Sequence, residues 1–206
     1  MAAAQLDKNW DDWTARLTES YAQTLELLDQ GKTEEAVYTY RSKFLLTVKQ
    51  LFSEAADVYP LRFEKSICWT DWTKKLYQLS HKAENALKAG KIDDARALLL
   101  ELRRHFYDLH NQCDSIKNNE ALFAVMEMLN REDVTAKQIT EAVDVLLAAE
   151  PCRKAKADND AYGQTLNQWV AETKPILEKD NLSENERTRL RDITQPFYKL
   201  YALQFE

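Results

Sequence analysis

A segment of 27 residues occurs twice in this chain, the second copy lying 59 positions after the first. Residues 10–36 align with residues 69–95 without a gap, and nine aligned positions are identical. The identical pairs are Trp10/Trp69, Asp12/Asp71, Trp13/Trp72, Thr14/Thr73, Leu17/Leu76, Leu28/Leu87, Gly31/Gly90, Lys32/Lys91 and Ala36/Ala95. A repeat of this length is typical of a supersecondary unit that buries its apolar face against a neighbouring copy. The sequence therefore predicts an internal duplication.

Each copy has the pattern of a hairpin of two antiparallel helices. Its apolar residues recur at spacings of three and four, which is typical of one face of an α-helix. In the first copy this face contains Trp10, Trp13, Leu17, Tyr21, Leu25 and Leu28. Gly31 and Gly90 follow the two stripes, as glycine does just past the end of a helix. Thr33 is then expected to cap the returning helix of the first copy.

The chain after the duplication is also predicted to be helical, with a less regular pattern. The predicted helices span residues 118–130, 136–149, 160–179 and 184–205. The second helix of each pair begins at a capping box, in which a side chain three residues into the helix bonds back to the cap. The two boxes are Thr135-x-x-Gln138 and Ser183-x-x-Glu186.

Together these patterns predict an all-α fold of about eight helices in tandem antiparallel hairpins. Residues 1–113 form a duplicated four-helix bundle unit. Residues 114–206 form a second helical subdomain of two further hairpins, which we expect to pack on the first. The composition agrees, because only 3 glycines and 4 prolines occur in 206 residues, too few for the turns of a many-stranded sheet.

Charge and hydropathy exclude two classes of partner. The formal net charge is −6, which disfavours a nucleic-acid binder. No stretch approaches the roughly 18 apolar residues of a spanning helix, so we expect no membrane span. The start of the chain, MAAAQLD, fits a mature protein that begins after a small-residue cleavage site. This gives a slight preference for a periplasmic or secreted protein over a cytoplasmic one, and the compartment stays open.

Two cysteines are expected to face each other at the open end of the second hairpin. Around the Gly90 turn, antiparallel partners have residue numbers that sum to about 181, which pairs Cys68 with Cys113. Facing positions on packed helices can reach the Cα separation that a disulfide needs. Closing this loop of about 45 residues would stabilise the fold by about 4 kcal/mol in the chain-entropy model. Two free, packed thiols are the alternative to a disulfide.

A metal site is a third interpretation of the same cysteines. His110 lies three residues before Cys113 and so shares its helical face. Cys68, His110 and Cys113 would then supply three soft ligands of the kind that bind Zn or Cu. The spacing of the sequence indicates no fourth ligand. Without such a soft transition metal, we expect no cofactor.

Four tryptophans mark the starts of the first helix of each copy. If the two hairpins pack in equivalent orientations, Trp10, Trp13, Trp69 and Trp72 gather at one end of the bundle. One interpretation is an aromatic plug that fills the open end of the bundle core. The other is a recognition surface for a protein partner, because tryptophan is favoured at interface hot spots.

The sequence contains no nucleophile–base pair, defined carboxylate pair or phosphate-binding loop that indicates catalysis. We therefore expect a non-enzymatic helical interaction or scaffold module that binds a protein partner. The alternative is a helical bundle that binds a small ligand or a metal at the cysteine and histidine site.

Overall fold

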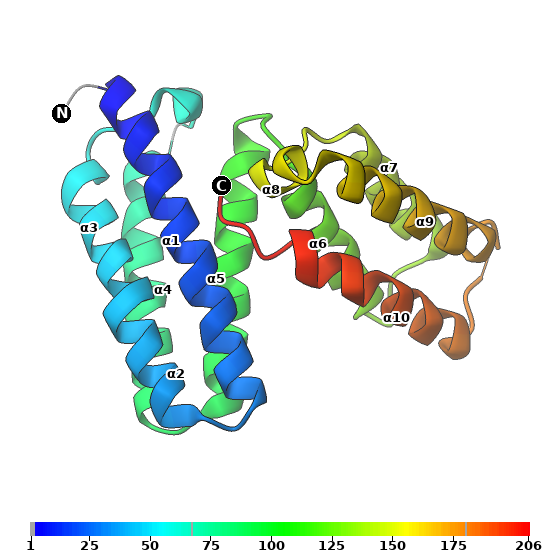
Figure 1. The fold of residues 1–206 in the computed structure, drawn as a ribbon, viewed down its shortest axis with the longest axis horizontal. Coiled ribbons are helices and arrows are strands. Elements are labelled where there is room, and N and C mark those ends of the chain that lie inside the picture. The colour runs from blue at the N-terminus through cyan, green and yellow to red at the C-terminus, as the bar shows by residue number, and fades with distance from the viewer. Residues whose placement is uncertain (1–2, 67, 180) are drawn as a thin grey trace. The chain divides into compact units, whose positions relative to one another are not determined.

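The computed structural model of the protein describes residues 3–66, 68–179 and 181–206. Residues 1 and 2, where the predicted cleavage-site motif begins, lie outside this part, as do residues 67 and 180. The described residues form helices and no strand of a sheet, which confirms the all-α prediction (Figure 1). The chain divides into two compact units, which we call unit 1, Met1–Asp114 with Phe205–Glu206, and unit 2, Ser115–Gln204.

Unit 1 consists of four helical rods that lie side by side (Figure 1). The second rod is continuous but changes its winding, since a six-residue π-helix, here called the π segment, joins α2 to α3. In chain order the elements are α1 (Ala3–Asp29), α2 (Thr33–Thr39), the π segment (Tyr40–Leu45), α3 (Leu46–Ala55), a 3₁₀ turn (Leu61–Phe63), α4 (Trp69–Lys88) and α5 (Ile92–Gln112).

The two turns of the duplicated hairpins have the same geometry. Gly31 and Gly90 have φ angles of 72° and 67°, in the left-handed region that glycine adopts most easily. The lysine after each glycine donates its N–H to the carbonyl five residues earlier, at 2.9 Å in the first turn and 3.0 Å in the second. This is the bond of a Schellman motif. The predicted cap is wrong, because Lys32 is the N-cap of α2 and Thr33 is its first helical residue.

The π segment has a simple origin in the repeat. Before it, buried positions of the two copies are 59 residues apart, as in Ala36 and Ala95. After it, they are 58 residues apart, as in Val48 and Phe106. The hydrogen bonds of a π-helix span one more residue than those of an α-helix, so a π segment can take up a single inserted residue. The first copy therefore contains one extra residue, and the π segment accommodates it without changing which residues face the core.

Two tyrosine hydrogen bonds show that the hairpins pack as equivalents. Tyr21 donates its hydroxyl to Leu99 O at 3.3 Å, and Tyr40 donates its hydroxyl to Ser80 O at 3.0 Å. Tyr21 and Ser80 are equivalent positions in the repeat, as are Tyr40 and Leu99. Tyr21 of the first copy therefore bonds to Leu99 of the second, and the equivalent of Tyr21 in the second copy, Ser80, bonds to Tyr40 of the first. Such reciprocal bonds are expected when a two-fold axis relates the two hairpins.

Unit 2 is built around a second core. Its elements are α6 (Asn118–Leu129), α7 (Ala136–Ala148), α8 (Arg153–Ala157), α9 (Asn159–Leu177) and α10 (Glu184–Tyr201). Both capping boxes are present, since Thr135 and Ser183 accept the predicted backbone bonds at the starts of α7 and α10. The α6–α7 pair and the α9–α10 pair pack against each other, because α10 contacts α6 as well as α9.

Within the described ranges, no helix combines the length and apolar character needed to cross a membrane.

Candidate functional site

The four predicted tryptophans lie in the core of unit 1. Trp10, Trp13, Trp69 and Trp72 are 0, 1, 4 and 5% exposed. The Trp10 ring is at the centre of the cluster, with ring centroids 4.7 Å from Phe63, 5.8 Å from Trp69 and 5.9 Å from Trp72. The cluster has the burial of the aromatic plug, and these side chains offer no exposed recognition surface in this structure.

The predicted cysteine site lies beside this plug but is not assembled as a bridge or a metal centre. Cys68 is the exposed N-cap of α4, Cys113 is buried at the end of α5, and both are free thiols. Burial raises the pKa of Cys113, and the charge of Asp114 acts in the same direction. The structure thus contains the free-thiol alternative and no disulfide between Cys68 and Cys113.

His110, the third predicted ligand, is buried in the plug. Its ring stacks on Phe63 with centroids 5.6 Å apart and planes 19° from parallel. Over the described ranges, no three histidine, cysteine, aspartate or glutamate side chains come together in a way that could hold a metal ion. The Cys68, His110 and Cys113 set is therefore not gathered into a ligand sphere here.

A different polar site borders the π segment. It surrounds Glu84 of α4, whose side chain is only 9% exposed. The carboxylate is 2.9 Å from Arg41 Nε, 2.6 Å from Lys88 Nζ and 3.2 Å from His81 Nδ1. Burial alone would raise the pKa of Glu84, but the hydrogen bonds and charges of these neighbours outweigh it and lower the pKa below its usual value. Glu84 is therefore ionised.

An open hollow of about 290 Å³ lies next to this carboxylate, between α4 and the second rod. It is lined by Tyr38, Arg41, Ser42, Leu45, Lys49 and Glu84. Sequence reasoning missed this site because Arg41 and Glu84 are 43 residues apart. The spacing of His81, Glu84 and Lys88, three and four residues apart on one helix, was the local signal.

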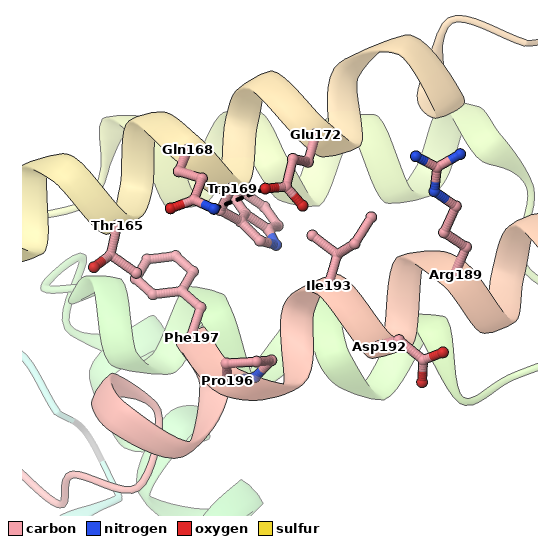
Figure 2. A pocket seen from close by; sticks show the side chains of 9 residues that line it. All are labelled: Thr165, Gln168, Trp169, Glu172, Arg189, Asp192, Ile193, Pro196 and Phe197. Carbon is pink, nitrogen blue, oxygen red and sulfur yellow. Dashed lines mark hydrogen bonds between the residues drawn. The ribbon is translucent and has the colours of Figure 1, made fainter.

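Unit 2 has a larger groove, of about 380 Å³, between α9 and α10 (Figure 2). The floor of the groove is formed by two buried aromatic side chains, one of which is held by a hydrogen bond. Trp169 and Phe197 are 3 and 1% exposed, and their ring centroids are 5.6 Å apart. Trp169 Nε1 donates a hydrogen bond of 3.0 Å to Thr194 Oγ1, which ties α9 to α10 under the groove.

The rim of the groove is polar and differs on its two sides. On α9, Gln168 Nε2 donates to Glu172 Oε1 at 2.9 Å, so this carboxylate already has a partner. On α10, Arg189 extends toward α9 and Asp192 points away from it, as Figure 2 shows. The side chain of Arg189 makes no hydrogen bond or ion pair with any residue in the described part of the chain. It is therefore the cation of this rim that is available to a ligand.

Comparison of the chain with known protein families, with curated proteins and with solved structures finds no match. The functional argument is accordingly made from the geometry of the two sites.

Proposed function

We propose that the protein is a non-enzymatic scaffold module that holds an amphipathic helix of a partner protein in the groove between α9 and α10. The observation that carries this proposal is the shape and chemistry of the groove. It has a rigid aromatic floor, apolar walls and a polar rim, which is the composition of helix-binding grooves. Two antiparallel helices with a groove between them offer the ridges against which a third helix packs.

One face of α10 extends the apolar surface beyond the groove. Ile193, Pro196 and Leu200 are spaced by three and four residues, so they share a face of the helix. Leu200 is 48% exposed and so adds apolar surface to this face. Arg189 lies on the same face one turn before Ile193. Since the helix rises about 1.5 Å per residue, the face is about 16 Å long and suits a partner helix of about three turns.

The charge of the rim specifies the orientation of the partner. Arg189 is exposed and available, whereas Glu172 is bonded to Gln168. An acidic side chain at one end of the partner helix would pair with Arg189, and apolar side chains would cover Ile193 and Leu200. Such a charge at the rim sets register and contributes less to affinity than the apolar contacts do.

Site-specific photo-crosslinking in cells that express the full chain tests this proposal. We expect a photoreactive residue at Leu200 to label one protein, on a helix with an acidic end. The same residue at Thr188, which is exposed on another face of α10, serves as the matched control and should give no such adduct. Equal labelling from both positions, or labelling of unrelated proteins, contradicts the proposal.

A synthetic peptide of the labelled segment then allows a quantitative test. We expect Ile193→Asp to weaken its binding to the purified chain at least about tenfold, because it places a charge in the apolar contact. Arg189→Glu should also weaken binding, and a peptide in which the acidic residue is changed to arginine should restore it. If that exchange restores nothing, the assigned orientation is wrong.

A further inference from the structure

The hollow beside Glu84 exists in only one half of the duplication. At three of the four equivalent positions of the other seam, the repeat has apolar residues in place of members of the ion-pair network, and at the fourth Asp29 pairs with Arg96. The equivalent pairs are Glu84/Leu25, Arg41/Leu100, His81/Ala22 and Lys88/Asp29. Because the two hairpins pack as equivalents, the seam with Leu25 and Leu100 shows that this packing does not require a buried carboxylate. The network around Glu84 therefore needs an explanation other than the fold.

The network fixes the orientation of an arginine at the mouth of the hollow. Arg41 Nε is 2.9 Å from Glu84 Oε1 in an ion pair, and the two terminal nitrogens of the guanidinium have no partner in the described part of the chain. The planar donors of arginine match the oxygens of carboxylates and phosphates. Glu84 is thus a positioning residue that holds Arg41 ready for such a group.

The hollow also carries a local excess of positive charge. Arg41 and Lys49 line the hollow and contribute two cations against the single charge of Glu84, which also pairs with Lys88, in a protein whose formal net charge is −6. Lys49 lines the hollow, and its side chain makes no hydrogen bond or ion pair over the described ranges. The charge that remains unpaired is therefore positive, which favours an anion.

The uncharged side chains that line the hollow indicate what the ligand carries besides its anionic group. Tyr38 and Leu45 provide an aromatic ring and an apolar side chain beside the two cations. The volume of about 290 Å³ is at the lower end of the range for small-molecule sites, which excludes a large cofactor. We propose that this hollow binds a small organic anion, with its carboxylate or phosphate on Arg41 and Lys49 and its apolar part against Tyr38 and Leu45.

Titration calorimetry of the full chain at constant ionic strength tests this inference, with phenyl phosphate, benzoate, inorganic phosphate and neutral phenol as probes. We expect saturable binding of phenyl phosphate or benzoate, and the tighter of the two identifies the anionic group. Phenol should not bind, and inorganic phosphate should bind more weakly than phenyl phosphate. Absence of saturable binding by both organic anions overturns the proposal, and equal binding of the two phosphates overturns the apolar contact.

Variants assign the binding to this hollow. Arg41→Leu changes an exposed residue to the one found in the other seam and should weaken binding at least about tenfold. The double variant Arg41→Leu with Glu84→Leu reproduces the Leu25 and Leu100 pair of the other seam, so it should fold and should not bind. Arg96→Leu removes an arginine that pairs with Asp29 elsewhere in unit 1 and is the matched control, with unchanged binding expected.

Unchanged binding in Arg41→Leu overturns the site. Glu84→Gln separates positioning from charge, because it removes a negative charge near the anion but also releases Arg41. We expect weaker binding, whereas stronger binding would show that Glu84 acts only by repulsion. The groove between α9 and α10 belongs to unit 2, so none of these outcomes affects the proposed function.

Discussion

Trp72 and His105 exchange hydrogen bonds across the α4–α5 hairpin. Trp72 Nε1 donates to His105 O at 2.8 Å, and His105 Nε2 donates to Trp72 O at 2.8 Å. Their rings stack with centroids 5.0 Å apart and planes 13° from parallel. A carbonyl oxygen can only accept, so the proton of the neutral imidazole lies on Nε2. The pair closes the plug end of the hairpin and keeps His105 uncharged.

This pair predicts a loss of stability in mild acid. Burial lowers the pKa of His105 to about 4, helped by the charge of Lys75 and partly opposed by the bond to Trp72 O. In the unfolded chain His105 binds a proton near pH 6.5, whereas in the folded chain it stays neutral until about pH 4. The stabilisation of the fold by neutral His105 is therefore complete above about pH 6.5 and is lost as the pH falls toward 4. We expect the free energy of unfolding to fall by about 2 kcal/mol between pH 7 and pH 5.

Urea unfolding followed by tryptophan fluorescence measures this change, because four of the five tryptophans are in unit 1. His105→Gln should remove most of the pH dependence. His81→Gln changes a half-buried histidine of the same hairpin and should retain it. An equal pH dependence in His105→Gln and the unchanged protein would show that another group is responsible.

The plug predicts large losses of stability when its rings are removed. Trp10→Ala and Trp69→Ala should each lower the free energy of unfolding by about 3 to 5 kcal/mol, because each leaves a cavity between buried rings. Trp69→Phe should cost less, since it keeps the ring contacts and loses the 2.6 Å bond from Trp69 Nε1 to Ala55 O. A loss below about 1 kcal/mol for both alanine variants would indicate exposed side chains.

The cysteines should differ in reactivity. In the folded protein without reductant, a thiol reagent should modify exposed Cys68 quickly and buried Cys113 slowly, because burial also raises the pKa of Cys113. Three thiols should react after unfolding. Cys68→Ser should remove the fast phase, and Cys152→Ser, which changes a buried position, should leave it unchanged. A single reactive thiol in the unfolded, unreduced protein would reveal a disulfide.

The sequence predicted those features that depend on local pattern. The turns at Gly31 and Gly90 and both capping boxes can be identified because their signals lie within a few residues of each other, and the duplication can be identified because its two copies align without a gap over 27 residues. The sequence alone could not show whether Trp10 lies in a buried aromatic plug or on an exposed recognition surface, because its burial depends on how the hairpins pack. The pairing of Arg41 with Glu84 joins residues that are distant in the chain, so no periodicity indicates it.

The π segment escaped prediction for a related reason. One extra residue leaves the apolar stripe of the second rod recognisable, because Ala36, Tyr40, Phe44 and Val48 still recur every four residues. Only comparison of buried positions in both copies shows that the spacing between them changes from 59 to 58 residues. That comparison requires coordinates.

If the π segment holds one inserted residue, deleting one residue from it should be tolerated. Removal of Ser42 would place Phe44 three residues after Tyr40, which is the spacing of Leu99 and Leu102 in the regular helix of the other copy. We expect the rod to become continuous α-helix with its core face unchanged. The free energy of unfolding should fall by about 1 kcal/mol or less.

Deletion of Lys49 is the matched control, because it removes one exposed residue from the regular helix α3. It rotates every later residue of the rod by about 100°, which turns Leu51 and Ala55 out of the core. We expect a loss of at least about 3 kcal/mol from urea unfolding. Equal losses for the two deletions would show that the π segment is not an insertion. Deletion of Ser42 should also abolish anion binding, because it removes the turn that presents Arg41 to Glu84.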